Sequence, residues 1–357
     1  MFAQRSYSAA LLIAALVALL AATTALAAPV VISDAVYEQI TADETLVLKS
    51  TVDTLREPRR PRFDRVIAFG DSSTDSGNVF NLTKGAWPVP ESYAQGRFSN
   101  GRTWVEYLAR HVVSERAPVL RNFAFGGATT DSKMVQGYTG PNSDVAVPAV
   151  MDQLVLFAKD VKRNPHLLEG RNLYAIWAGG NDLFFSDAAI SPDTLANNLI
   201  RAVEAIDDIH ANVDHARTPH VLLMGMADFN YMPYFASLDD ASRAKFIAAS
   251  KAFNVALAKH VQAYRASMAA MRRRARLTFV PTAHIVPDIL ANPEGHGFPR
   301  GTVVNACLDA NLAVCKDPDY HVYWDLFHFA TQTHAVLGSA AANAAVGGRA
   351  SVAVDQE

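Results

Sequence analysis

One segment of the sequence predicts a strand that is followed by a turn and a helix: Val66-Ile67-Ala68-Phe69-Gly70-Asp71-Ser72-Ser73-Thr74-Asp75-Ser76-Gly77-Asn78. An apolar run of strand type stops at Gly70, and polar residues suited to starting a helix follow it. A serine in a sharp strand-to-helix turn holds its hydroxyl above the sheet edge, as nucleophilic acyl transfer requires. The same residues also fit an ordinary turn in which Ser72 or Asp75 caps a helix.

Two distant segments favour the catalytic interpretation. Ile176–Asp182 is a second apolar run that ends in glycines, an asparagine and an aspartate. Trp324–His328 places an aspartate three residues before a histidine near the C-terminus. Together the three segments supply a nucleophile, an oxyanion donor, an acid and a base, which are the groups that an esterase needs.

Strand-like runs alternate with longer helical patterns from Phe63 onward. This alternation predicts a parallel sheet covered by helices on both faces, with all strand C-termini at one edge. Ser72, Gly127 and Asn181 each follow a strand candidate, so we expect them to meet at that edge. The expected strands are Arg65–Phe69, Arg121–Phe125, Leu173–Trp177, His220–Met224 and Leu277–Val280; the expected helices are Thr103–Ser114, Pro148–Arg163, Asp193–Val213, Asp239–Arg274, with an interruption allowed, and Thr331–Ala345.

These motifs together resemble those of the GDSL-type, or SGNH, hydrolases. The family's first block reads Phe-Gly-Asp-Ser-Leu-x-Asp-x-Gly-Asn, and Phe69–Asn78 matches it with Ser73 in place of the leucine. The other matching segments follow in family order and are Gly96–Arg102, Asn122–Ala128, Gly179–Asp182 and Asp325–His328. The family usually has proline after the histidine, where this chain has Phe329, so we expect a different loop shape and unchanged chemistry.

The resemblance implies a fold and an activity. The fold is a three-layer α/β/α sandwich around a five-stranded, mostly parallel, flavodoxin-like sheet. The activity is carboxylic ester hydrolysis of the lipase, phospholipase and thermolabile-haemolysin-like branch, with acyl transfer to an alcohol in some relatives. The resemblance implies neither a cofactor nor a metal ion.

Three residues are the expected catalytic triad. Ser72 is the nucleophile, and His328 is the base that takes its proton and returns it to the leaving alcohol. Asp325 lies three residues before the histidine, so in a helical turn both side chains would share a face. His321 and His334 are nearby alternatives for the base, but neither has the matched spacing.

The expected oxyanion hole combines the backbone N–H groups of Ser72 and Gly127 with the side-chain amide of Asn181. Glycine at position 127 lets the backbone approach the substrate closely. The alternative interpretations are a plain turn at Gly126-Gly127 and a turn cap at Asn181. Loss of one donor of this kind typically lowers the rate by about 10²–10³-fold.

Residues 1–28 are typical of a targeting segment. Arg5 precedes the apolar stretch Ala9–Ala22, and Ala25-Leu26-Ala27 supplies small residues for cleavage. We therefore expect a secreted or periplasmic protein, although a retained anchor is the alternative. The expected organisation continues with an extension or linker at 29–62, a hydrolase domain at 63–345 and a tail at 346–357.

The cysteines and the net charge bear on three possibilities: a disulfide, a metal site and a nucleic-acid-binding surface. Cys307 and Cys315 are the two cysteines of the chain, and in an exported protein we expect them to form a disulfide. Two free buried thiols are the alternative, and no accompanying ligand pattern indicates a metal site. The formal net charge of −3 gives no indication of a nucleic-acid surface.

The substrate is the least specified part of the prediction. Aromatic residues crowd the loops that should surround the sheet edge, which predicts an apolar acyl pocket and a lipid or small acyl ester as substrate, with transient contact to a lipid surface. The alternatives are a carbohydrate esterase for short acyl groups and a non-catalytic surface-binding protein on the same fold. The aromatic residues are Trp87, Tyr93, Phe98, Tyr138, Phe184, Phe185, Phe229, Tyr231, Tyr234 and Phe235.

Overall fold

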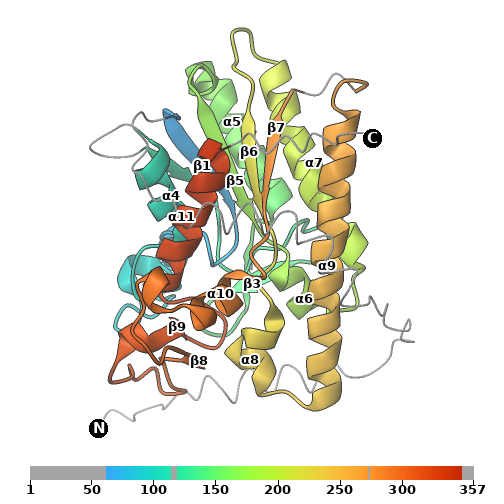
Figure 1. The fold of residues 1–357 in the computed structure, drawn as a ribbon. Coiled ribbons are helices and arrows are strands. Elements are labelled where there is room, and N and C mark those ends of the chain that lie inside the picture. Colours follow the sequence, from blue (N-terminus) through green and yellow to red (C-terminus); the bar gives the residue numbers. More distant parts are fainter. Residues whose placement is uncertain (1–61, 114–118, 272–273, 348–357) are drawn as a thin grey trace.

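A five-stranded parallel sheet forms the centre of the computed structural model, which describes residues 62–113, 119–271 and 274–347 (Figure 1). Its strand order, β2-β1-β5-β6-β7, is the flavodoxin-like order expected from the resemblance. All four neighbouring pairs are parallel, so the expected "mostly parallel" sheet is wholly parallel here. The strands are β1 (Arg65–Gly70), β2 (Leu120–Asn122), β5 (Asn172–Trp177), β6 (His220–Met224) and β7 (Arg276–Val280).

Helices cover both faces of this sheet, which confirms the three-layer α/β/α fold. Helices α4 and α11 pack against each other on one side, and α7 packs against both α5 and α9 on the other. The larger helices are α4 (Trp104–Val112), α5 (Val150–Arg163), α7 (Pro192–Ala211), α9 (Asp240–Ser267) and α11 (Thr331–Gly347). Shorter ones are α3 (Asn78–Leu82), α6 (Gly180–Phe185), α8 (Pro233–Ala236) and α10 (Ile285–Ala291).

The expected elements are present, most with ends within two residues of the expected ones, and β2 and α9 differ more clearly. Strand β2 stops at Asn122, although the N–H groups of Phe123 and Phe125 still donate to carbonyls of β1. Helix α9 runs unbroken for 28 residues and ends at Ser267, so the extension to Arg274 was wrong. It begins where the Asp239 carboxylate accepts hydrogen bonds from two backbone N–H groups, a typical N-cap.

Two small sheets beside the main one were not predicted. An antiparallel pair joins β3 (Gly137–Thr139) to β4 (Val145–Val147), and a parallel pair joins β8 (Val303–Ala306) to β9 (His321–Tyr323). Strands of three or four residues are too short to give a clear alternation of polar and apolar residues. Both pairs belong to the loops that surround the C-terminal edge of the main sheet.

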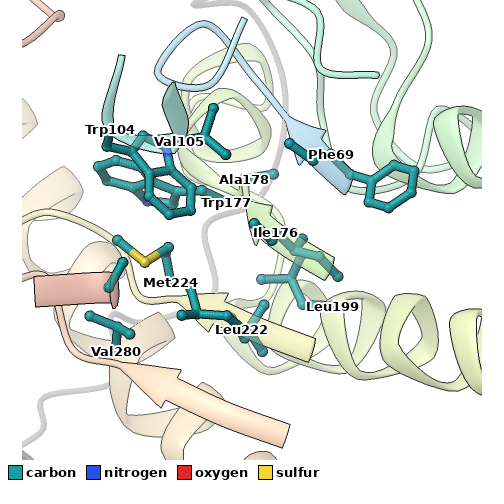
Figure 2. Close-up of a cluster of buried hydrophobic side chains, with 14 of the residues drawn as sticks. Phe69, Trp104, Val105, Ile176, Trp177, Ala178, Leu199, Leu222, Met224 and Val280 are labelled. Carbon is teal, nitrogen blue, oxygen red and sulfur yellow. The ribbon is translucent and has the colours of Figure 1, made fainter. Parts of the chain in front are cut away.

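The core lies on both faces of the sheet. Trp104 of α4 packs edge-on against Trp177 of β5, with ring centroids 5.7 Å apart. Figure 2 shows Trp104 of α4 and Leu199 of α7 reaching the strands from opposite sides. Because both of their faces are buried, the three central strands β1, β5 and β6 are mainly apolar runs, as is usual for parallel sheets.

Several expectations concern segments outside the described residues. The leader at 1–28 and the extension at 29–62, except Arg62, fall there, as does the tail from residue 348. Val346 and Gly347 belong to α11. Within the part of the chain that the structure describes, no helix has the length and apolar character needed to cross a membrane.

Candidate active site

Ser72 lies in the turn between β1 and α3, two residues beyond the end of the strand. Gly70 is required there, because its φ is +148° and an added Cβ would lie 2.2 Å from the Trp177 carbonyl oxygen. The Asp75 carboxylate holds the next part of the turn by accepting from the N–H groups of Gly77, Asn78 and Val79. Asp75, and not Ser72, thus binds the N–H groups at the start of α3, and the Ser72 side chain forms no hydrogen bond among the described residues.

The Gly126-Gly127 loop is tied to the same turn. The N–H of Gly126 donates to Asp75 Oδ2 at 2.9 Å, which links the loop to the Ser72 turn. Gly127 has a φ of +87°, and an added Cβ would lie 2.0 Å from the carbonyl oxygen of Tyr138. Among the described residues, nothing accepts the N–H groups of Ser72 or Gly127, and both residues line the same cavity. Two backbone donors are therefore available to a ligand.

Asn181 lies near the N-terminus of α6, immediately beyond the C-terminal end of β5. Its side-chain Nδ2 donates one hydrogen bond to the carbonyl oxygen of Ala128, 2.9 Å away. An amide nitrogen carries two hydrogens, so the second remains available. Asn181 lines the cavity with Ser72 and Gly127, and the three predicted oxyanion donors surround one space.

Asp325 and His328 form a short hydrogen-bonded pair in the loop between β9 and α11. His328 Nδ1 lies 2.7 Å from Asp325 Oδ2, and only 14% of the Asp325 side chain is exposed. The expected helical turn is absent. Instead, Asp325 Oδ1 accepts from the backbone N–H groups of Phe327 and His328, a local turn that competes with helix formation. The pair nevertheless forms at the predicted spacing.

The charge on Asp325 is stabilised in place. Burial raises the pKa of its carboxyl, but the neighbouring His328 and the hydrogen bonds from His328 and Tyr93 outweigh that effect. The pKa of Asp325 consequently lies below its usual value, and the residue is a carboxylate at neutral pH. A carboxylate on Nδ1 keeps the other ring nitrogen, Nε2, available as a base.

His328 and Ser72 line the same cavity, but no hydrogen bond joins them directly in the described structure. Such bonds are often long in ligand-free sites and shorten when substrate binds. The two alternative bases lie elsewhere: neither His321 nor His334 lines the cavity. His334 is buried behind Trp104, whose backbone N–H donates to its Nδ1, and burial lowers the His334 pKa to about 3.

The cavity has a volume of about 460 Å³ and a predominantly apolar wall. Eight of the ten aromatic residues expected to form an acyl pocket line it, whereas Tyr231 and Tyr234 do not. The residues that line it include no lysine or arginine among those described. The eight are Trp87, Tyr93, Phe98, Tyr138, Phe184, Phe185, Phe229 and Phe235.

A disulfide joins Cys307 to Cys315, as expected. The loop that it closes contributes Leu308, Asp309, Ala310 and Leu312 to the cavity wall. The same loop is attached to the residue that precedes Asp325, since the Leu308 N–H donates to the Trp324 carbonyl oxygen at 2.7 Å. The disulfide therefore stabilises part of the site as well as the fold.

Two contacts of the site carry no signal in the sequence. The Tyr93 hydroxyl donates to Asp325 Oδ2 at 2.7 Å, whereas the sequence predicts Tyr93 only as part of the apolar wall. Asp182, next to Asn181, accepts hydrogen bonds from the N–H and hydroxyl of Thr130. Thr130 follows the Gly127 loop, so Asp182 joins the two segments that carry the expected oxyanion donors. Burial raises the pKa of Asp182 to about 7.

The sequence of this chain was compared with those of known protein families. The model of the GDSL-like lipase/acylhydrolase family matches residues 66–341. The chain belongs to this family. That membership confirms the predicted GDSL family, and the family's description as lipases and acylhydrolases agrees with the predicted ester hydrolase.

Individual relatives of this GDSL-family chain are distant. The thermolabile hemolysin of Vibrio parahaemolyticus is 25% identical over 288 residues, covering 76% of this chain and 62% of that protein. The phosphatidylcholine-sterol acyltransferase of Aeromonas hydrophila is 39% identical over 70 residues, 20% of each chain. A solved inhibitor-bound aryl esterase of M. smegmatis aligns with 78% of this chain and 96% of its own, at 15% identity and a TM-score of 0.38.

Proposed function

We propose that this protein is an exported serine ester hydrolase that cleaves esters of apolar acyl groups, with lipids as its natural substrates. One observation carries the proposal: the Asp325–His328 pair, Ser72 and three free N–H donors all border one apolar cavity. The pair and the donors match the groups of serine-dependent acyl transfer, and the apolar wall matches an acyl chain.

The first half of the reaction forms an acyl-enzyme. Ser72 Oγ attacks the ester carbonyl carbon while His328 Nε2 takes the hydroxyl proton, and Asp325 stabilises the imidazolium that results. The carbonyl oxygen becomes an oxyanion that accepts hydrogen bonds from the Ser72, Gly127 and Asn181 N–H groups. Collapse of this intermediate breaks the bond to the alcohol oxygen, which leaves with the proton from His328.

The second half returns the free enzyme. A water molecule gives a proton to His328 and attacks the acyl carbon, and the bond to Ser72 Oγ then breaks. Ser72 recovers its proton from His328, and the carboxylic acid leaves. An alcohol in place of water would yield a new ester, so the enzyme transfers acyl groups wherever an alcohol reaches the acyl-enzyme before water does.

The cavity favours an acyl chain over a sugar. Its apolar wall offers few hydrogen-bonding partners for the hydroxyl groups of a polysaccharide, whereas aromatic side chains suit a hydrocarbon chain. Its volume, about 460 Å³, is within the range of small-molecule sites. With no lysine or arginine among the lining residues described, a charged phosphate of a lipid would stay outside the cavity.

Export is part of the proposal and rests on the sequence. The leader-like residues 1–28 and the pair Cys307 and Cys315 both fit an oxidising compartment. N-terminal sequencing of the protein recovered from the producing cell's periplasm or medium would test it. A mature N-terminus near residue 28 supports export with cleavage, and an intact Met1 in the cytoplasm contradicts it.

The test of the activity is a series of p-nitrophenyl esters from acetyl to palmitoyl, hydrolysed by wild type and by Ser72→Ala. We expect a Ser72-dependent rate that is highest for medium or long chains. A rate that is highest for acetyl would replace the lipid substrate with the short-acyl carbohydrate alternative. A folded protein without activity on any ester would overturn the proposal in favour of a non-catalytic binding role.

A further inference from the structure

We propose that Tyr93 is a positioning residue of the catalytic triad, whose hydroxyl fixes the Asp325 carboxylate so that His328 faces Ser72. The inference deepens the proposed function and depends on it. Among the described residues, no hydrogen bond joins Tyr93 to the nucleophile or to the oxyanion donors, so Tyr93 acts through Asp325.

The Tyr93 hydroxyl binds the same carboxylate oxygen as the catalytic imidazole. Asp325 Oδ2 lies 2.7 Å from the Tyr93 hydroxyl and 2.7 Å from His328 Nδ1. The other oxygen, Oδ1, accepts from the N–H groups of Phe327 and His328. Three of these four hydrogen bonds come from within the triad loop itself. The Tyr93 bond is the one that comes from a distant part of the chain, 232 residues away.

Tyr93 is itself held in place. Its side chain is 7% exposed, and its ring lies 6.4 Å from the rings of both Trp87 and Phe98. Phe98 in turn lies 5.1 Å from the imidazole of His328. Burial, and then the nearby charge of Asp325, raise the Tyr93 pKa far above its usual value, so the hydroxyl stays a hydrogen-bond donor. A fixed ring with a permanent donor suits a positioning role.

The neighbouring residue, Ser92, attaches this segment to both adjoining loops. Its carbonyl oxygen accepts from the indole N–H of Trp324 at 3.0 Å, one residue before Asp325. Its hydroxyl donates to the carbonyl oxygen of Leu312 in the disulfide loop at 3.1 Å. Tyr93 also packs in one apolar cluster with Cys307 and Leu308. Residues 92–93 thus link the disulfide loop to the triad acid.

This arrangement makes two physical predictions. Without the hydroxyl, the carboxylate is free to rotate, and the imidazole spends less time aimed at Ser72, so kcat falls while KM stays unchanged. The Asp325 charge is also no longer shared with a donor and stabilises the imidazolium more strongly. The acid limb of the pH profile of kcat/KM should therefore move to higher pH.

The experiment compares Tyr93→Phe with Tyr174→Phe on the full-length protein. Tyr174 is a matched control, because its buried hydroxyl lies 2.6 Å from His210 Nε2 and it does not line the cavity. We expect Tyr93→Phe to lower kcat about tenfold with KM within twofold, as befits a hydrogen bond to a charged group, and to shift the acid limb upward. Tyr174→Phe should lower only the melting temperature.

A double-mutant cycle with Asp325→Asn separates positioning from stability. If Tyr93 acts through Asp325, the Tyr93→Phe change has no further effect on kcat in the Asp325→Asn background. Additive losses, or a fall in kcat with an unmoved pH profile, would overturn the proposal. If Tyr93→Phe does not fold, 3-fluorotyrosine can replace Tyr93, because it retains the shape of the side chain and its hydroxyl donates more strongly. The acid limb of the pH profile should then move to lower pH. An acid limb that does not move would overturn the proposal.

The same data distinguish this inference from the proposed function. An inactive wild-type protein, or activity that survives Ser72→Ala, contradicts the serine esterase itself. A wild-type enzyme with Ser72-dependent activity and a Tyr93→Phe variant of equal kcat and equal pH profile leaves the esterase intact and removes Tyr93 from its machinery.

Discussion

The side chain of Asn181 donates to the backbone carbonyl oxygen of Ala128 at 2.9 Å, which joins the two segments that border the proposed oxyanion hole. Ala128 directly follows Gly127, which lines the same cavity and whose N–H has no acceptor among the described residues. The bond therefore sets the direction of the second N–H of the amide relative to the backbone donor. A rigid donor geometry is what stabilises charge in a transition state.

Replacement of Asn181 tests this geometry. Asn181→Ala removes both the tether and the donor, and Asn181→Asp replaces the donor with an acceptor. We expect kcat to fall by about 10²–10³-fold in either variant while the melting temperature changes little. Steady-state kinetics and thermal unfolding check this. Asn212→Ala, an exposed asparagine at the end of α7, is the control, and a near-normal kcat in Asn181→Ala would exclude Asn181 from the site.

Asp182 should make stability depend on pH. Burial raises its pKa from the usual 3.8 to about 7, so the folded state holds a proton that the unfolded state releases. That contribution to stability is complete below about pH 4 and is lost as the pH rises through 7. Asp182→Asn mimics the protonated form, so its stability relative to wild type should increase between pH 4 and 8. Urea unfolding at several pH values measures this difference, and a constant difference would contradict the assignment.

The disulfide should support both the fold and the cavity. A loop closed by Cys307 and Cys315, eight residues apart, is expected to contribute about 2–3 kcal/mol. We expect Cys307→Ser combined with Cys315→Ser to lower the free energy of unfolding by that amount and to raise KM, because the loop lines the cavity. Reduction of the wild type by dithiothreitol should reproduce both effects. Unchanged KM in a less stable variant would restrict the disulfide to a structural role.

Phe184 should influence the choice of acyl chain. It lines the cavity three residues after Asn181, and its ring lies 5.6 Å from that of Phe327, the neighbour of His328. Phe184→Ala enlarges the cavity, so the ratio of kcat/KM for palmitoyl to butyryl esters should rise by about tenfold. Tyr231→Ala is the control, since Tyr231 does not line the cavity. Equal ratios in both variants would show that the acyl chain does not contact Phe184.

Much of the fold and of the candidate site could be predicted from local patterns. Ser72, Asn181 and the Asp325–His328 pair each follow an apolar run or have a fixed spacing, and parallel strands bring the ends of such runs to one edge. The contacts that hold these groups in place join segments far apart in the chain. Tyr93 reaches Asp325 across 232 residues, and Asp182 reaches Thr130 across 52, so no local pattern reveals them.

Two predictions from the sequence were wrong for local physical reasons: the helical turn at Asp325 and the end of helix α9. The expected helical turn at Asp325 is replaced by a turn in which its own side chain binds the backbone N–H groups, an option that aspartate offers and that a spacing rule ignores. Helix α9 ends at Ser267, seven residues before the expected end. Propensity alone predicts such boundaries only to within a few residues.

Covalent labelling tests whether Ser72 is the residue that carries the acyl group. The protein is incubated with an alkyl fluorophosphonate, which phosphonylates activated serines, and intact mass and peptide mapping then locate the adduct. We expect one adduct per chain, on Ser72, that is absent in Ser72→Ala and forms far more slowly in His328→Ala. A folded protein that acquires no adduct, or acquires it on another residue, would exclude Ser72 as the nucleophile.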